Sequence, residues 1–356
     1  MLPLRIKSAR LLVGISLHDL AERTNKQLSQ PTLSRYERGD STPNSENLRL
    51  LARALDLPLD YFLRQHVDLG RVEFRKRSRL SKKREAKILE QTRDFLERYL
   101  ETEHLLNQNS QPLPTYQQAV RTGEEAEHAA DHLRKEWRLG LNPIHSIVEE
   151  LEAQDIRVLA LPSDEKFDGL SSLPGGEHSF IVYNSDLSIK PIDRQRFTLL
   201  HELGHHYLPI PEGEDDEGLV NRFAGAFALP ASVMKDRIGS TRKRIHPTEL
   251  LGLKKEFGLS VAALLYRAKD LDIITQNTFR QAMMTLTYQG WRKNEPQVFA
   301  GDERPTRLLE ILARGIIEET ISTTKAAQLY GMKLGEFRYA LLHEMNLPQP
   351  SPQQNA

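Results

Sequence analysis

The segment FTLLHELGHHYL, residues 197–208, brings together three side chains that can carry out metal chemistry. His201 and His205 are four residues apart, so a helix would place both imidazoles on one face, about one turn apart. Two imidazoles in that arrangement can bind one metal ion, and Glu202 can reach a water molecule that the ion activates. The spacing therefore predicts a metal-dependent hydrolase site, although short motifs of this kind also arise by chance.

A catalytic zinc site needs a third protein ligand and one open position. The sequence contains no cysteine, so this third ligand must be a histidine or a carboxylate. Glu217 begins an apolar helix shortly after the motif and is our first candidate; Glu214, Asp215 and Asp216 are the alternatives. Gly204 in the first helix would let the backbone of the second helix approach closely.

Hydrolysis of a peptide also needs a donor for the developing oxyanion. His206, Tyr207 and His178 are the nearby candidates, but His206 also fits a partly exposed surface residue and His178 an ordinary loop residue. The apolar run SFIVYN, residues 179–184, predicts a strand. That strand is either an ordinary core strand or an edge to which an extended substrate adds by strand pairing.

A second pattern lies near the N-terminus, where two short helices are separated by a polar turn. Ser16 can cap a helix that contains Leu20 and Ala21, and Ser29 can cap a second helix over residues 30–38 that ends at Gly39. Polar and basic side chains near the start of the second helix can reach base edges in a DNA major groove. The candidate DNA-contacting residues are Ser29, Gln30, Thr32, Ser34 and Arg35. The alternative is a small helical bundle that binds protein.

This stretch resembles the phage-repressor-like (XRE) helix-turn-helix family over about 60 residues. The resemblance rests on the Leu20-Ala21 pair, on LSRYERG at 33–39, on Pro43 and on LARALDLPLDYFL at 51–63. It implies binding to double-stranded operator DNA and a buried ion pair between Arg10 and Glu37. The turn between the two helices is about two residues longer than the usual pattern of the family.

The region 120–275 resembles the ImmA/IrrE family of metallopeptidases. The resemblance rests on EHAADHLRKEW at 127–137, LNPIHSIVEELEAQDIRV at 141–158, FDGLSS at 167–172, IVYN at 181–184, RQRFTLLHELGHHYL at 194–208, NRFAGAFALP at 221–230 and KKEFGLSVAALLYRAKDL at 254–271. It implies a minimal zincin-like domain that binds one divalent ion, Zn²⁺ with Mn²⁺ as the alternative. The implied ligands are His201, His205 and Glu217, and the implied general base is Glu202.

Two further segments carry weaker signals. Residues 71–87 contain nine Lys and Arg against two Glu, which is typical of a solvated helix face and also suits contact with DNA phosphates. Residues 306–345 have a helix-turn-helix-like layout in which Ser322 can cap a helix and Gly331 ends it. Few outward basic residues follow that turn, so we expect a helical cap or a dimer contact there rather than a second DNA-reading helix.

The length of 356 residues suggests two or three domains, and equal numbers of basic and acidic residues, 49 each, exclude no class of partner. No apolar run approaches the ~18 residues of a membrane span, and we read no signal peptide, so we expect a cytoplasmic protein without membrane contact. The fold expected is mainly α with a small β-sheet (α+β). The expected segments are a helix-turn-helix domain at 1–66, a basic helix and linker at 67–119, the metallopeptidase domain at 120–275 and a helical C-terminal region at 276–356.

Together these patterns predict a transcriptional regulator, expected as a homodimer, that carries a zinc-type metallo-endopeptidase. The resemblance suggests a stress-response, mobile-element or toxin–antitoxin setting, with a repressor, antitoxin or toxin as the protein partner or substrate. The alternative hypothesis is a DNA-binding regulator whose metal domain senses a signal or a partner and cleaves nothing.

Overall fold

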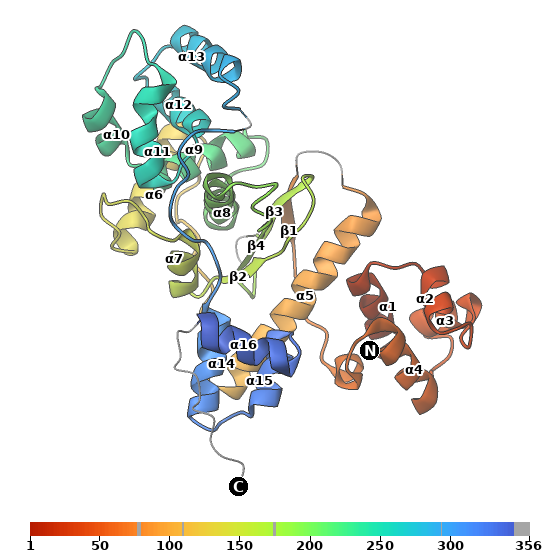
Figure 1. Cartoon of the computed structure of the whole chain (residues 1–356). Helices are drawn as coiled ribbons and strands as arrows, with labels where there is room; N and C mark the ends of the chain where they lie inside the picture. Colours follow the sequence, from red (N-terminus) through yellow and green to blue (C-terminus); the bar gives the residue numbers. More distant parts are fainter. Residues whose placement is uncertain (77–79, 109, 174–175, 293, 345–356) are drawn as a thin grey trace. The chain divides into compact units, whose positions relative to one another are not determined.

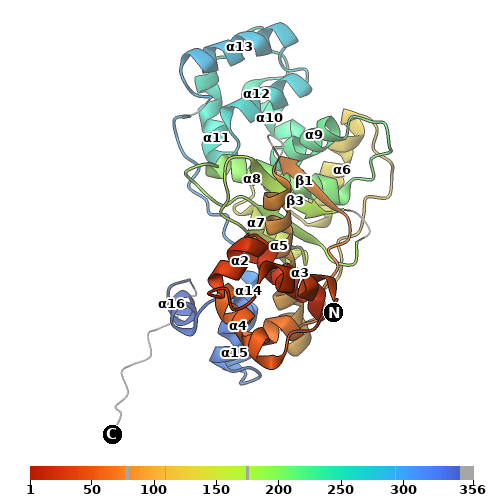
Figure 2. The same ribbon diagram turned by 90° about the vertical axis from the view of Figure 1, so that its right-hand side faces the viewer.

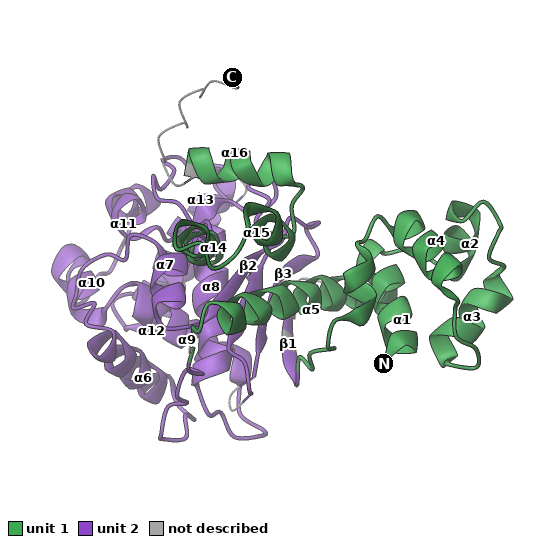
Figure 3. Ribbon diagram, turned by 90° about the horizontal axis from the view of Figure 1, so that it is seen from below, with its two compact units in different colours: residues 1–69, 79–110, 307–356 green, residues 70–78, 111–306 purple. Residues whose placement is uncertain are grey.

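The computed structural model describes residues 1–76, 80–108, 110–173, 176–292 and 294–344, and its contacts divide the chain into two compact units (Figure 3). Unit 1 comprises residues 1–69, 79–110 and 307–356, and unit 2 comprises residues 70–78 and 111–306. The helical region expected at 276–356 is therefore divided, because residues up to 306 pack in unit 2 and the helices after them pack in unit 1. The polar tail, 351–356, lies outside the described residues.

The N-terminal helices of unit 1 follow the capping signals in the sequence. They are α1 (Leu2–Val13), α2 (Leu17–Arg23), α3 (Gln30–Arg38), α4 (Ser45–Leu55) and the 3₁₀ helix η1 (Leu59–Leu63). Ser16 forms a capping box with Asp19 at the start of α2, and Ser29 accepts a hydrogen bond from the Thr32 amide at the start of α3. In the long turn between these helices, Asn25 and Lys26 both adopt left-handed backbone conformations, with φ of 52° and 61°.

The remainder of unit 1 is built on one long helix, α5 (Lys82–Leu105), which Ser81 caps. The C-terminal helices α14 (Arg307–Ile317) and α15 (Thr323–Tyr330) pack against α5, and α16 (Leu334–Glu344) packs against α15. On the N-terminal side, α1 packs against α5, where Arg5 and Glu97 form a buried two-pronged ion pair with distances of 3.0 and 2.8 Å. Both ends of the chain thus belong to one unit that has α5 at its centre (Figure 3).

Unit 2 contains a four-stranded sheet with the strand order β1-β3-β4-β2 (Figure 1). The strands are β1 (Val72–Lys76), β2 (Arg157–Ala160), β3 (Phe167–Ser172) and β4 (Phe180–Tyr183). The β2–β4 pair is parallel, whereas β3 is antiparallel to both β4 and β1. Together with the surrounding helices, this sheet confirms the expected class of mainly α with a small β-sheet.

One sequence-based expectation about this sheet is wrong, and one of two alternatives is excluded. The basic run 71–87 is predicted to lie on a helix face, but its first residues form β1, and α5 begins only at Lys82. The residues 77–79 of that run lie outside the described part of the chain. The run SFIVYN contains β4, which is paired on both sides by β3 and β2 and so offers no edge to a substrate strand. Its four residues are all buried, as expected of a core strand.

The helices of unit 2 include α8, which holds His201, Glu202 and His205 and contacts β3 and β4. They are α6 (Gly123–Glu136), α7 (Ile147–Ala153), α8 (Ile192–Tyr207), α9 (Asp216–Ala228), α10 (Ala231–Ile238), the 3₁₀ helix η2 (Pro247–Leu250), α11 (Leu251–Phe257), α12 (Val261–Asp270) and α13 (Gln276–Tyr288). Helices α10 to α13 gather at one end of the unit (Figures 1 and 2). Within the described residues, we find no helix that combines the length and the apolar character needed to span a membrane.

Candidate functional site

The helix α8 is fixed in the core of unit 2 by apolar packing and by charged anchors near its start. Leu199, Leu200 and Leu203 are fully buried. The buried Arg196 guanidinium forms an ion pair with Glu303 and donates a 2.8 Å hydrogen bond to the carbonyl of Ile144. Removing one partner of a buried ion pair is strongly destabilising. These contacts therefore keep α8 in one rotational orientation about its axis.

The two motif histidines meet on one face of α8, as their spacing predicts. The Nε2 atoms of His201 and His205 are 3.0 Å apart. His201 is fully buried and His205 is 5% exposed, so both rings lie at the inner end of the site rather than on the surface. A tetrahedral zinc ion with bonds of about 2.0–2.1 Å would hold two nitrogens roughly 3.3 Å apart, which is close to the observed spacing.

The helix α9 approaches α8 closely because Gly204 has no side chain at the crossing. A Cβ atom at Gly204 would lie 2.9 Å from Val220 Cγ1 and 3.2 Å from Phe223 Cδ1, both on α9. Val220 and Phe223 are themselves fully buried. The contact confirms the role expected for Gly204, and it brings the first two turns of α9 beside the histidines.

The carboxylate at the start of α9 completes a three-residue cluster. Glu217 Oε2 lies 3.6 Å from His201 Nε2, and Glu217 Oε1 lies 3.8 Å from His205 Nε2. One ligand atom from each of these three residues falls within 4.8 Å of the other two. The Glu217 side chain is 65% exposed, so the cluster opens to solvent on this side.

The neighbouring carboxylates occupy different positions. Asp216 Oδ2 lies 3.4 Å from His205 Nδ1, on the opposite side of the imidazole from Glu217. Asp215 accepts a hydrogen bond from the Gly218 amide and caps α9. Of the alternatives considered from sequence, Asp216 and Asp215 thus have other contacts, and Glu217 is the carboxylate that faces both Nε2 atoms.

Polar contacts also fix the orientation of the histidine rings. Asn221 Oδ1 lies 3.0 Å from His201 Nδ1 and can accept a hydrogen bond from it, while Asp216 is placed to do the same for His205. Both contacts favour the tautomer that carries a lone pair on Nε2, which is the form that binds a metal. Together with the spacing of the three ligand atoms, this satisfies the requirements of a divalent ion bound by two imidazoles and one carboxylate.

Glu202 lies outside this cluster and is held by β3. Its side chain is fully buried, and its Oε2 accepts a 2.8 Å hydrogen bond from Ser171 Oγ. A Cβ atom at Gly169, two residues earlier in β3, would lie only 3.0 Å from Glu202 Oε1, so the absence of a side chain there leaves room for the carboxylate. β3 therefore both orients Glu202 and accommodates it.

The oxyanion-donor candidates on α8 prove to have structural contacts. His206 is buried rather than exposed: its Nδ1 lies 2.8 Å from the Ser172 carbonyl and its Nε2 lies 3.0 Å from Ser179 Oγ. Burial lowers the pKa of His206 below its ordinary value, and the contact with the Ser172 backbone partly opposes that shift. The hydroxyl of Tyr207 lies 3.2 Å from His132 Nδ1. His178 is half-buried in the loop before β4.

The candidate DNA-contacting residues lie on α3 as expected. Gln30 and Arg35 are exposed, and Thr32 and Ser34 are half-buried, whereas the hydroxyl of Ser29 is used in capping the helix. The ion pair implied between Arg10 and Glu37 is present, with two contacts of 2.6 and 2.8 Å that join α1 to α3. These contacts orient α3 while leaving its outward face open.

Several contributing residues are not identified by sequence reasoning. Ser171 and Gly169 appear only within the quoted segment FDGLSS, and Asn221 appears only as the first residue of NRFAGAFALP. Asn221 does have a weak signal, since it lies four residues after Glu217 and so on the same face of a helix. No comparable spacing rule links β3 to Glu202, because that contact joins residues 31 positions apart.

Comparison with known protein families agrees with the two sites. Residues 6–62 match the family model described as helix-turn-helix, and residues 151–269 match the one described as IrrE N-terminal-like domain, a peptidase family. No curated protein and no solved structure gives a significant match to the chain. The chain thus joins a helix-turn-helix domain, typical of DNA-binding regulators, to a metallopeptidase-like domain, which implies a divalent metal.

The crossing of α8 and α9 gives a first prediction. Gly204→Ala should lower the free energy of unfolding by about 1–3 kcal/mol, the usual cost of overpacking, because the new methyl group would meet Val220 and Phe223. Urea unfolding measures the change. Gly252→Ala is the matched control, since a Cβ on that α11 residue meets nothing within 4 Å and should be neutral or stabilising. If Gly204→Ala and Gly252→Ala have the same free energy of unfolding, α8 and α9 do not need this close approach.

Proposed function

We propose that this chain is a DNA-binding transcriptional regulator whose second domain is a metal-dependent endopeptidase acting on a repressor- or antitoxin-type protein. The observation that carries the peptidase assignment is that the residues placed to bind a metal and the residue placed to transfer a proton are different side chains of the same site. His201, His205 and Glu217 face one another, while Glu202 is buried beside them and oriented by Ser171. A purely structural zinc site would have four protein ligands, whereas these three residues leave one position open, and it would not need an oriented carboxylate next to them.

In this proposal, His201, His205 and Glu217 hold one divalent ion, with Zn²⁺ favoured by the two imidazoles and one carboxylate and by the spacing of their ligand atoms. Such an ion supplies Lewis-acid activation of a water molecule and of the scissile carbonyl. The chain's own contribution is the proton transfer. Glu202 takes a proton from the attacking water at its carboxylate and returns it to the leaving amine.

Ser171 acts in this scheme as a positioning residue. Its hydroxyl donates to Glu202 Oε2, so the carboxylate keeps one orientation through the reaction. The proximity of Gly169 means that a larger residue there would crowd the carboxylate. General acid–base catalysis depends on such geometry as much as on the pKa of the group.

The peptidase proposal predicts the behaviour of Glu202→Gln. This variant should keep the bound metal and DNA binding but lose hydrolysis of its protein target, since general acid–base catalysis contributes roughly 10²–10⁴ in rate. The measurement compares new protein N-termini by mass spectrometry in cells that express the wild type or the variant under the inducing condition. Glu124→Gln, an exposed carboxylate on α6, is the matched control and should give the wild-type pattern.

A promoter reporter in the same cells separates the two hypotheses about function. If Glu202→Gln induces normally and the wild type generates no specific new N-termini, the peptidase proposal is rejected. A regulator whose metal domain only senses a signal or partner would then remain.

The DNA-binding proposal rests on the outward face of α3. Each good base contact contributes about 1–3 kcal/mol of discrimination, so Gln30→Ala and Arg35→Ala should weaken binding to the operator more than binding to random DNA. Gel-shift titrations at fixed salt measure both affinities. Arg53→Ala, an exposed basic residue on α4, is a control for the loss of charge. An equal loss of affinity on both DNAs would mean that Gln30 and Arg35 contact only phosphates.

A further inference from the structure

The C-terminal helices α15 and α16 repeat the local pattern of α2 and α3. Each pair starts with a serine cap, Ser16 or Ser322, and the fifth residue after the serine is a buried alanine, Ala21 or Ala327. Each second helix buries its fourth and seventh residues, Leu33 and Tyr36 in α3. In α16 the equivalent residues are Phe337 and Ala340, which are also buried.

The spacing between the helices of the α15–α16 pair is closer to the usual helix-turn-helix pattern than that of the α2–α3 pair. Phe337 lies ten positions after Ala327, whereas Leu33 lies twelve positions after Ala21. The difference matches the two extra residues in the turn after α2. Gly331 closes α15 in a left-handed conformation with φ of 84°, so the chain reverses into α16 within a short turn. α15 and α16 therefore form a helix-turn-helix with a shorter turn than the N-terminal one.

The outward face of α16 carries side chains that suit DNA. Lys333 and Arg338 are exposed, and Tyr339 is 65% exposed with its ring 4.0 Å from that of His343. An Arg side chain can bind guanine with two hydrogen bonds, and an aromatic ring can contact the thymine methyl group. Glu336 on the same helix is exposed too, and Lys333 and Arg338 are the basic residues offered, so the number of phosphate contacts would be small.

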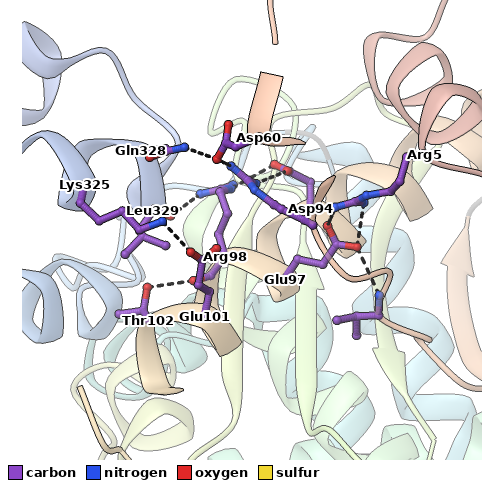
Figure 4. A network of polar contacts seen from close by, with 12 residues as sticks. Arg5, Asp60, Asp94, Glu97, Arg98, Glu101, Thr102, Lys325, Gln328 and Leu329 are labelled. Carbon is purple, nitrogen blue, oxygen red and sulfur yellow. Dashed lines mark hydrogen bonds and ion pairs between the residues drawn. The ribbon is translucent and has the colours of Figure 1, made fainter. Parts of the chain in front are cut away.

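The turn of this second motif is fixed to α5. Lys325 forms a 2.5 Å ion pair with Glu101, and Arg98 donates a 2.8 Å hydrogen bond to the Leu329 carbonyl (Figure 4). Gly331 has a left-handed φ that favours glycine, and a Cβ atom there would lie 2.6 Å from Arg98 Nη1, so the guanidinium would have to shift. The contacts hold α15 by its inner face and leave the outer face of α16 uncovered by α5.

The same helix α5 holds the N-terminal helices. Glu97, one turn before Glu101, binds Arg5 of α1 (Figure 4). The guanidinium of Arg5 also lies 4.6 Å from the centre of the Tyr61 ring. Gln328 of α15 donates directly to the Asp60 carboxylate in η1. The N-terminal bundle, through α1 and η1, and the C-terminal helix-turn-helix are thus attached to α5 and to one another within unit 1.

We propose that α16 is a second DNA-reading helix, so that one chain contacts two different segments of a duplex through α3 and α16. The proposal rests on the DNA-binding function proposed above and departs from the cap or dimer contact expected from sequence. What favours duplex DNA as the occupant is the repeated helix-turn-helix pattern, the basic and aromatic outward face, and the attachment of both motifs to α5.

The test is a selection of sequences from a random pool of DNA duplexes of about 40 base pairs, which spans several helical turns of 10–10.5 base pairs. The full-length protein is used as the wild type, as Arg35→Ala, as the double variant Arg338→Ala, Tyr339→Ala, and as Arg338→Ala alone. Arg314→Ala is the matched control, because it removes one exposed positive charge from the neighbouring helix α14. Thermal unfolding of each variant confirms that these exposed substitutions leave the fold intact.

The wild type and Arg314→Ala should enrich two unlike sequence elements at a fixed spacing. The double variant should no longer select one element and Arg35→Ala should no longer select the other. Affinity for the complete site should fall roughly 5- to 150-fold for each side chain that no longer reaches its base. Arg338→Ala alone should weaken selection of the same element that the double variant fails to select.

If the wild type selects two like elements, or if the double variant still selects both elements with wild-type affinity, α16 reads neither element, and the proposal for α16 is rejected while DNA binding by α3 stands. If the wild type enriches no element, both the α16 proposal and the DNA-binding function proposed above are rejected.

Discussion

The close approach of α8 and α9 at Gly204 is the constraint on which the metal cluster depends. In the proposed site the ligands come from two helices, and the third, Glu217, lies in the first turn of α9. Any side chain at the crossing would separate the helices and carry Glu217 and Asn221 away from the imidazoles. One glycine thus sets the distance between the ligands, and the apolar packing of Val220 and Phe223 maintains it.

A second constraint acts from the sheet, on the other functional carboxylate. β3 positions Glu202 through Ser171 and leaves room for it at Gly169. β3 is itself joined to the start of α8 by Asp168, whose carboxylate binds Lys190 and Arg194. The metal ligands and the proposed general base are therefore supported separately, the ligands by the contact between α8 and α9 and the base by β3. This arrangement allows a metal to bind without engaging Glu202.

Much of the site could be predicted from sequence because its main signals are local. The helical spacing of His201 and His205 fixes their common face, and capping residues mark the helices of the N-terminal domain. The missed features depend on contacts between distant residues. FDGLSS contains glycine and serine, which are not typical of strands, so the pattern does not reveal β3. β1 is hidden within a basic run, and the burial of His206 depends on serines from two other segments.

Contacts between distant residues also explain why the two compact units are discontinuous in sequence, whereas the segments expected from sequence are continuous. The ion pair of Lys325 with Glu101 joins residues 224 positions apart, and no local pattern predicts such a contact. The sequence therefore indicates which helices form at the C-terminus but not that they pack on α5. That packing is what makes the C-terminal helix-turn-helix part of the unit that also contains α3.

The central claim is that α8 and α9 hold one catalytic metal ion and leave Glu202 for proton transfer. Anomalous X-ray diffraction from crystals of the zinc-loaded protein tests it most directly. The account predicts one ion per chain, about 2.0–2.2 Å from His201 Nε2, His205 Nε2 and a Glu217 oxygen, with Glu202 outside direct coordination. An ion bound by Asp216 or Glu202 in place of Glu217, or no ion between α8 and α9, would contradict the account.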